Sequence, residues 1–264
     1  KNTNILILHK FKTIQKKSKP GILFLSLGHL PFFDELYDDL ITRISQTTTI
    51  KRIKNPSAAK TYLDALVLTN PTDGTNNRRA ILITDQALTD RRNKAILTKT
   101  LAYARAGGTV IAGFHFPSFS PKNDFDRFFN QGCGLPWKAG AYHRAEFEFN
   151  PSSGSASGSA SASASALAGG GGGGGDAATM PGPYSMKALH VKNVRAEERV
   201  FVPIDGAVTQ SHVFPAEEVD SDDGQAPVAG AKMGEQGGRL YYIGDVNAEV
   251  ESTQVVLALC GLQP

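Results

Sequence analysis

Polar residues of catalytic type follow four apolar runs of this chain. They are His29 after GILFLSLG, Asp85 after AILIT, His115 after GGTVIAGF and Asp245 after GRLYYIG. An imidazole can take up and release a proton near neutral pH, and a carboxylate can orient an imidazole or bind a cation. The pattern therefore predicts acid/base chemistry or ligand binding, with His115 and His29 as the catalytic pair and the two aspartates as substrate-binding residues.

Two further residues, His143 and Arg144, stand at the start of an alternating segment and are predicted to line the same pocket. The structural alternatives are that His115 only bonds its own loop, that His29 caps a helix and that the aspartates are ordinary turn residues. No metal is predicted, because the two cysteines lack metal-ligand spacing. No cofactor is predicted, because no glycine-rich nucleotide-binding motif opens a helix.

The segments that carry these residues alternate between strand-like and helix-like patterns. Continuous apolar runs predict buried strands over 21–27, 80–84, 109–114 and 239–244, with a further strand at 48–53. Apolar residues at helical spacing predict helices over 33–44 and 90–107. Strands joined by helical crossovers form a parallel sheet covered on both faces, and the carboxyl ends of parallel strands share one edge. The four polar residues should therefore meet in one crevice.

Beyond residue 120 the pattern weakens. It predicts a short helix over 124–130, strands over 143–150, 187–194, 208–214 and 228–233, and a closing helix over 248–260. We interpret these segments as part of one α/β domain covering 21–264. A Ser/Ala/Gly-rich insertion, 151–183, interrupts it and is expected to be flexible, as is a polar insertion at 70–77. Residues 1–20 hold six lysines and no acid, which predicts a disordered basic tail.

The charge balance and the cysteine content limit the partners and the location. Because the basic excess lies in 1–20, the remaining chain is slightly acidic and shows no basic stripe, so no nucleic-acid partner is expected. The only apolar run before residue 21 is four residues long, and no membrane partner is expected. Two cysteines favour a reducing, cytoplasmic location. The expected partner is a small-molecule ligand, and the oligomeric state is left open.

Three segments carry a resemblance to a known family. GILFLSLGHLPFF, GGTVIAGFHFPSF and PVAGAKMGEQGGRLYYIGDVNAE resemble the ThuA-like (trehalose-utilisation-like) family of the class I glutamine-amidotransferase-like superfamily. The resemblance covers 21–262 without the insertions. It implies a three-layer flavodoxin-like fold with a mostly parallel sheet, helices on both faces and a pocket at the strand ends. Members of the family mostly lack an assigned reaction.

This sequence also departs from the superfamily at two positions. The turn that presents a cysteine nucleophile in amidotransferases reads Gly113-Phe114-His115 here, and Asp245 stands where the family has a histidine. Two functions remain open. One is a hydrolase-type or isomerase-type enzyme acting on a small carbohydrate-like or acyl substrate, with His115 as acid/base. The other is a non-catalytic small-molecule-binding or regulatory module that has lost the nucleophile. Hydrogen bonds among the histidines and an aspartate would favour the enzyme, and a filled crevice would favour the module.

Overall fold

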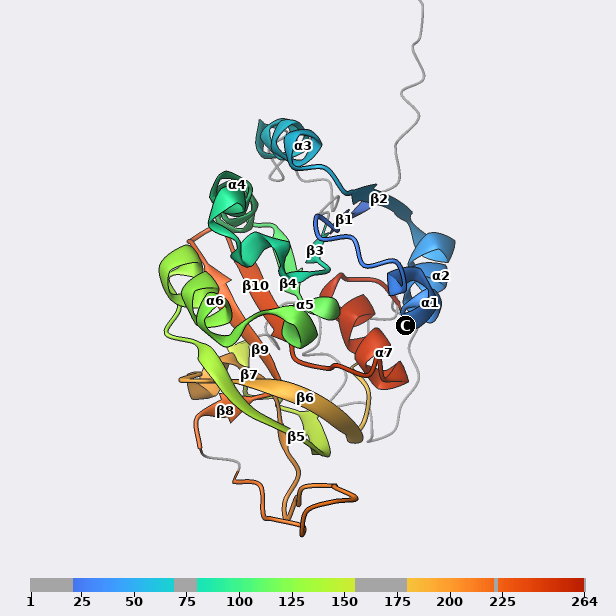
Figure 1. Cartoon of the computed structure of the whole chain (residues 1–264), viewed down its shortest axis with the longest axis vertical. Coiled ribbons are helices and arrows are strands. Elements are labelled where there is room, and N and C mark those ends of the chain that lie inside the picture. The colour runs from blue at the N-terminus through green and yellow to red at the C-terminus, as the bar shows by residue number, and fades with distance from the viewer. Residues whose placement is uncertain (1–20, 69–79, 155–179, 221–222, 264) are drawn as a thin grey trace, which may run out of the picture.

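The computed structural model describes residues 21–68, 80–154, 180–220 and 223–263. The expected tail 1–20, the insertion 70–77 and most of the insertion 151–183 lie outside the described residues. The described chain is an α/β protein with one mixed ten-stranded sheet and helices packed alongside it (Figure 1). The strands are β1 (Gly21–Leu25), β2 (Thr49–Ile53), β3 (Ala80–Ile83), β4 (Thr109–Ala112), β5 (Lys138–Phe149), β6 (Tyr184–Lys192), β7 (Arg199–Pro203), β8 (Gln225–Ala226), β9 (Val228–Met233) and β10 (Gly238–Ile243).

Seven α-helices and four short helical segments accompany these strands in the described ranges. The α-helices are α1 (Phe33–Leu36), α2 (Asp38–Thr47), α3 (Pro56–Leu68), α4 (Lys94–Arg105), α5 (His115–Phe119), α6 (Lys122–Arg127) and α7 (Val250–Leu259). The short segments are the 3-10 helices η1 (Gln86–Thr89), η2 (Arg91–Asn93) and η6 (Ala196–Glu198) and the π-helical turn η3 (Phe128–Cys133). Among the described helices, none is long and apolar enough to span a membrane.

The parallel half of the sheet has the order β2-β1-β3-β4-β10. The strands predicted at 21–27, 80–84, 109–114 and 239–244 are confirmed, and all four run parallel in adjacent positions. All four residues of β3 are buried, as its AILI run predicts for a strand covered on both faces. The carboxyl ends of β1, β3, β4 and β10 therefore lie at the same edge of the sheet.

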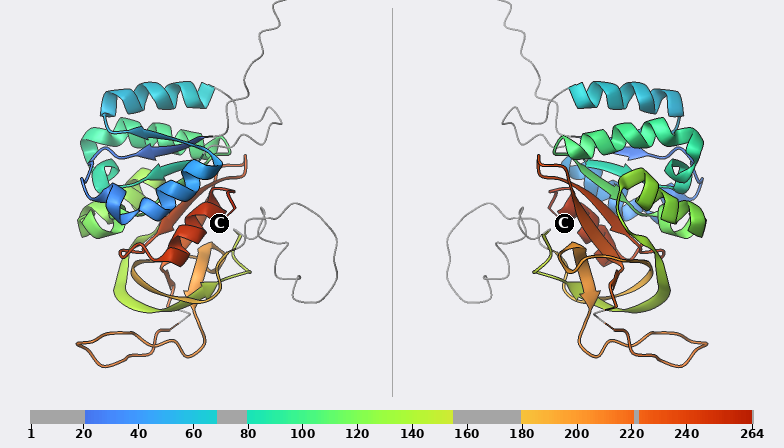
Figure 2. Two further views of the ribbon diagram at one scale, coloured as in Figure 1. Left: turned by 90° about the vertical axis from the view of Figure 1, so that its right-hand side faces the viewer. Right: turned by 90° about the vertical axis from the view of Figure 1, so that its left-hand side faces the viewer.

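Two apolar clusters cover the two faces of this parallel half. Helices α3, α4, α5 and α6 pack on the face that carries Leu23, Ile81 and Val110. Helices α1, α2 and α7 pack on the opposite face, against Phe24 and Leu82. Figure 2 shows the two groups of helices from either side. The predicted helix 33–44 is broken at Tyr37 into α1 and α2.

The expectation of a mostly parallel sheet is wrong, because strands β10, β9, β7, β5, β6 and β8 pair antiparallel along the second half. The connection from β9 to β10 covers only 234–237 and allows antiparallel neighbours, whereas parallel strands need a crossover of about a dozen residues. The predicted strand 208–214 is also wrong. This segment lies in an exposed loop whose one bridge in the described chain joins Val208 to Glu218.

The insertion 151–183 connects two neighbouring strands, because Phe147 of β5 pairs with Tyr184 of β6. Its first residues pack on the domain: Ser153 is buried, and the carbonyl of Gly154 accepts a hydrogen bond from Arg239. Residues 155–179 lie outside the described chain. The insertion therefore connects β5 to β6, which are paired neighbours in the same sheet.

Candidate functional site

Three of the predicted residues line one small cavity at the carboxyl edge of the parallel strands. His29 follows β1, Asp85 follows β3 and His115 follows β4. The chain runs from β1 outward to β2 and then returns to β3 on the other side, so the cavity lies where the direction of the connections switches. Ligands of open α/β sheets bind at such switch points. The cavity leaves no space for a water molecule in this structure.

The turn between β4 and α5 has a strained backbone at Phe114. Its φ of 64° and ψ of −116° lie outside the regions that a phenylalanine ordinarily adopts. A strained strand-to-helix turn of this kind presents the nucleophile in elbow-type enzymes, and the following N–H helps to form the oxyanion hole. Here the residue is a buried phenylalanine whose ring packs on Tyr37 at 5.2 Å. The N–H of His115 donates to the carbonyl of Thr84 at 3.2 Å.

The two cysteines supply no nucleophile at this turn. Cys133 is buried in the apolar cluster that also contains residues of α4 and α6. Cys260 follows α7, and neither cysteine lines the cavity of His115. Burial raises the pKa of both thiols, which disfavours the reactive thiolate. Trp137 is likewise a core residue, and its indole N–H donates to Glu198 at 3.0 Å.

His115 is the most unusual side chain of the cavity. It is 2% exposed, and neither ring nitrogen has a hydrogen-bond partner within the described chain. Burial lowers its pKa, so the ring is neutral at pH 7. Four aromatic rings surround it at centroid distances of 4.7 to 5.5 Å, namely those of Phe32, Phe33, Tyr37 and Phe119. A buried imidazole with two unsatisfied nitrogens destabilises a fold, and such a group is expected where a ligand supplies the missing partners.

His29 and Asp85 lie beside His115 but form no side-chain hydrogen bond with it in the described structure. His29 is exposed, has a φ of 38°, and its Nε2 lies 3.0 Å from Lys54 Nζ. Asp85 accepts the N–H groups of Gly28 at 2.9 Å, His29 at 3.3 Å and Ala87 at 3.0 Å. Burial raises the pKa of Asp85, while these hydrogen bonds act in the opposite direction. Its visible role is to hold the loop after β1.

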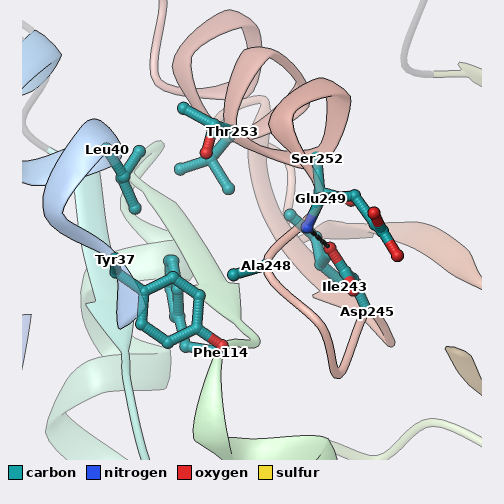
Figure 3. Close-up of a pocket in the computed structure, with 10 residues that line it drawn as sticks. Tyr37, Leu40, Phe114, Ile243, Asp245, Ala248, Glu249, Ser252 and Thr253 are labelled. Atoms are coloured by element: carbon teal, nitrogen blue, oxygen red, sulfur yellow. Dashed lines mark hydrogen bonds between the residues drawn. The ribbon is translucent and has the colours of Figure 1, made fainter. Parts of the chain in front are cut away.

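Asp245 lines a second cavity of about 20 Å³, which is room for one water molecule (Figure 3). Tyr37 and Phe114 line this cavity and also pack together, while Tyr37 also contacts the His115 ring. The Asp245 carboxylate accepts the N–H groups of Asn247 and Glu249, both at 2.8 Å. Burial raises its pKa. The structure therefore places Asp245 next to the His115 cavity rather than in it.

His143 and Arg144 lie on β5, outside the residues that line the His115 cavity. The His143 ring is 4.4 Å from that of His190 on β6. Burial lowers the pKa of both histidines, to about 3 for His190. Arg144 forms an ion pair with Glu249, which belongs to the Asp245 cavity. Arg144 thus supports the wall of the second cavity, and the half-buried His143 forms a separate pair with the buried His190.

The aromatic residues around His115 were missed as site residues by sequence reasoning. Phe33 and Tyr37 read as the buried stripe of one helix, and Phe32 and Phe119 carried no separate signal. The sequence has two aromatic-rich turns, HLPFF at 29–33 and FHFPSF at 114–119. Together they are the pattern that could have indicated these residues. Within the described residues, no group of three or more His, Cys, Asp or Glu side chains is arranged to hold a metal ion.

Neither a scan against protein-family models nor a search of curated proteins returned a match to this sequence.

Proposed function

We propose that this protein is a ThuA-like α/β domain that binds a small carbohydrate-like or acyl ligand in the crevice around His115. We further propose that it acts as a non-catalytic binding or regulatory module of the amidotransferase-like superfamily. The observation that carries the proposal is the elbow at Phe114, which has the strained backbone of a nucleophile turn but a buried phenyl ring in place of a nucleophile.

Two features support the family and the place of the site. The parallel strands follow the order 2-1-3-4-5 when numbered along the chain, which is the flavodoxin-like order with its ligand crevice between the first and third strands. His115 lies at that crevice. The proposal includes a cytoplasmic location, in line with the two free cysteines, and no nucleic-acid or membrane partner.

The chemistry of the crevice favours an uncharged ligand with both apolar and hydrogen-bonding parts. A neutral imidazole offers one donor and one acceptor, which suits a hydroxyl or a carbonyl group. Phe32 and Phe119, 44% and 42% exposed, lie over the His115 ring, so their movement would admit a ligand and provide apolar faces for it. The C–H face of a sugar or the chain of an acyl group matches such faces.

Thermal unfolding tests this proposal with three uncharged probes, trehalose, glucose and butyramide, each at about ten times its dissociation constant. Saturation to that level stabilises the folded state by about 1.4 kcal/mol and raises Tm by about 3 °C or more. We expect this shift for at least one probe with the wild type. We expect none with His115→Phe, whose Tm without ligand should equal or exceed that of the wild type, because two unsatisfied nitrogens are removed.

The matched control is His212→Phe, at an exposed loop position. It should keep the ligand-induced shift. The proposal fails if no probe shifts the wild type, or if His115→Phe keeps the full shift.

The second candidate is an enzyme that uses His115 as acid/base, and one observation favours it. A neutral imidazole with two unpaired nitrogens at a switch-point crevice is ready to accept a proton. Hydrolysis of nitrophenyl butyrate and nitrophenyl glucosides distinguishes the two. The enzyme predicts turnover that falls about 100-fold in His115→Ala with little change in stability. The module predicts no turnover above that of the variant.

A further inference from the structure

The loop between β7 and β8 carries the two most exposed large apolar side chains among the described residues. Val213 and Phe214 are 80% and 72% exposed, and every residue from 210 to 218 is exposed. The loop, drawn in orange, extends from the end of the molecule opposite α3 (Figures 1 and 2). Adjacent, fully exposed apolar side chains on a protruding loop commonly mark an interaction site.

Hydrogen bonds hold residues 209–217 of this loop in a defined conformation. At its base, the N–H of Thr209 donates to the carbonyl of Glu217 at 2.8 Å, and the N–H of Gln210 donates to the carbonyl of Arg144 on β5 at 2.8 Å. At its tip, Ser211 Oγ accepts the N–H groups of Val213 at 3.1 Å and Phe214 at 3.0 Å. The loop is therefore preorganised, so docking would cost little ordering entropy.

A groove of matching character lies between η1, η2 and α4 on one side and α6 and η3 on the other. Its cavity volume is about 360 Å³. Its apolar wall is made by Leu88, Leu97 and Phe128, which are 2%, 7% and 2% exposed, and its charged rim by Arg91, Lys94, Arg127 and Asp90. Asp90 is paired with Arg92. Arg127 is paired with Asp124. Within the part of the chain that the structure describes, Arg91 and Lys94 form no ion pair.

The loop and the groove are complementary in charge as well as in polarity. Glu217 and Glu218 follow the apolar tip, are exposed, and form no ion pair with a described residue. We propose that the loop of one molecule inserts Val213 and Phe214 into the groove of a second copy of this chain. The two glutamates then face Arg91 and Lys94 of that copy. The acidic flank disfavours a membrane as the occupant, because anionic headgroups would repel it.

A second basic groove, lined by Lys51, Arg52 and Lys54, fits the loop less well. Each of its cations already has a neighbour: Arg52 is paired with Asp34, Lys54 with His29, and Lys51 lies over the ring of Tyr62. The groove is also more open, with a volume of about 710 Å³. Charge reversal in this second groove is therefore the control for charge reversal in the first groove.

The proposed contact joins two different surfaces, so it is heterologous and can add further copies head to tail. Two inserted side chains bury much less than the area of a stable interface, so the association should be weak. Because it includes exposed charges, it should weaken as salt rises. We expect a concentration-dependent series of species in low salt that shifts toward monomer in high salt.

Sedimentation velocity of the full chain, from about 10 µM to about 1 mM in low salt, tests the proposal. The wild type should associate. The loop variant Phe214→Ser and the groove double variant Arg91→Glu/Lys94→Glu should each remain monomeric. The control double variant Lys51→Glu/Lys54→Glu should associate as the wild type does, because its loop and proposed groove are intact.

Mixing the two deficient variants gives the sharpest outcome. Phe214→Ser keeps an intact groove and Arg91→Glu/Lys94→Glu keeps an intact loop, so their mixture should form a one-to-one dimer and no larger species. A wild type that is monomeric at about 1 mM overturns the proposal. So does association of either variant alone at the wild-type level, or a mixture that stays monomeric.

Discussion

His190 should lower the free energy of unfolding by about 1.4 kcal/mol for each pH unit of acidification between about pH 6.5 and pH 3. Burial holds the pKa of this histidine at about 3 in the folded protein, whereas an unfolded histidine titrates near 6.5. Below pH 6.5 the unfolded chain therefore binds a proton that the folded chain does not. His143 and His115, whose pKa values are also lowered by burial, act in the same direction.

Two buried carboxyl groups oppose this trend. Burial raises the pKa of Asp85 and Asp245, so the folded protein retains protons that unfolded aspartates release above about pH 3.9. Their contribution to stability therefore grows as the pH falls through their folded pKa values. The net slope of the wild type combines both effects, and a variant is needed to isolate the histidine.

Chemical denaturation of wild type and His190→Asn at several pH values isolates that contribution. The variant lacks the proton that His190 binds on unfolding, so its unfolding free energy should depend less steeply on pH. The difference in unfolding free energy between the two proteins should change by about 2–3 kcal/mol over two pH units. His212→Asn, in the exposed loop, should follow the wild type. Parallel pH profiles for wild type and His190→Asn would show that His190 is protonated in the folded state.

Gly244→Ala should destabilise the protein by about 3 kcal/mol or more. A Cβ at this position would lie 2.1 Å from the carbonyl oxygen of Leu189 and 3.0 Å from that of Pro227. Neither carbonyl can withdraw easily, because Gly244 donates its N–H to Pro227 and accepts the N–H of Leu189. The substitution would force apart the end of β10 and the middle of β6, which together place Asp245.

Denaturant unfolding of this variant has a matched control in Gly182→Ala. The Cβ of that substitution has no described atom within 4 Å, and its φ is not positive. The control should unfold with a free energy within about 0.5 kcal/mol of the wild type. Equal stability of Gly244→Ala and Gly182→Ala would mean that the close approach at Gly244 is relieved at no cost.

Strands β1, β3, β4 and β10 of the parallel half were predictable because they are buried on both faces. A strand such as Ala80–Ile83 must be apolar at every position, and the helical segments between such strands force parallel crossovers. The antiparallel half was not predictable in the same way. Some of its strands alternate, as Tyr184–Lys192 does, and alternation indicates which face of a strand is buried but not the direction of the neighbouring strand. The segment 208–214, predicted as a strand, has only the isolated bridge from Val208 to Glu218 within the described chain.

The position of the site followed from topology, and its chemistry did not. Strand ends in adjacent positions bring three of the four predicted residues, His29, Asp85 and His115, to one cavity. Asp245 follows β10, on the far side of β4 from β3, and the rings of Tyr37 and Phe114 line its separate cavity. The strained backbone of Phe114 had no sequence signal, because a phenylalanine ordinarily avoids positive φ. Tertiary packing alone creates the elbow and the aromatic enclosure of His115.

The most direct test of the central claim is the imidazole NMR signal of His115 during titration with trehalose, glucose and butyramide. If the crevice around His115 binds this class of ligand, its carbon-bound ring proton should shift with at least one probe, while that of the exposed His212 should stay in place. The shift should follow the same dissociation constant as the rise in Tm. A His115 signal that stays unmoved at saturating concentrations of all three probes would contradict the claim, whether or not Tm rises.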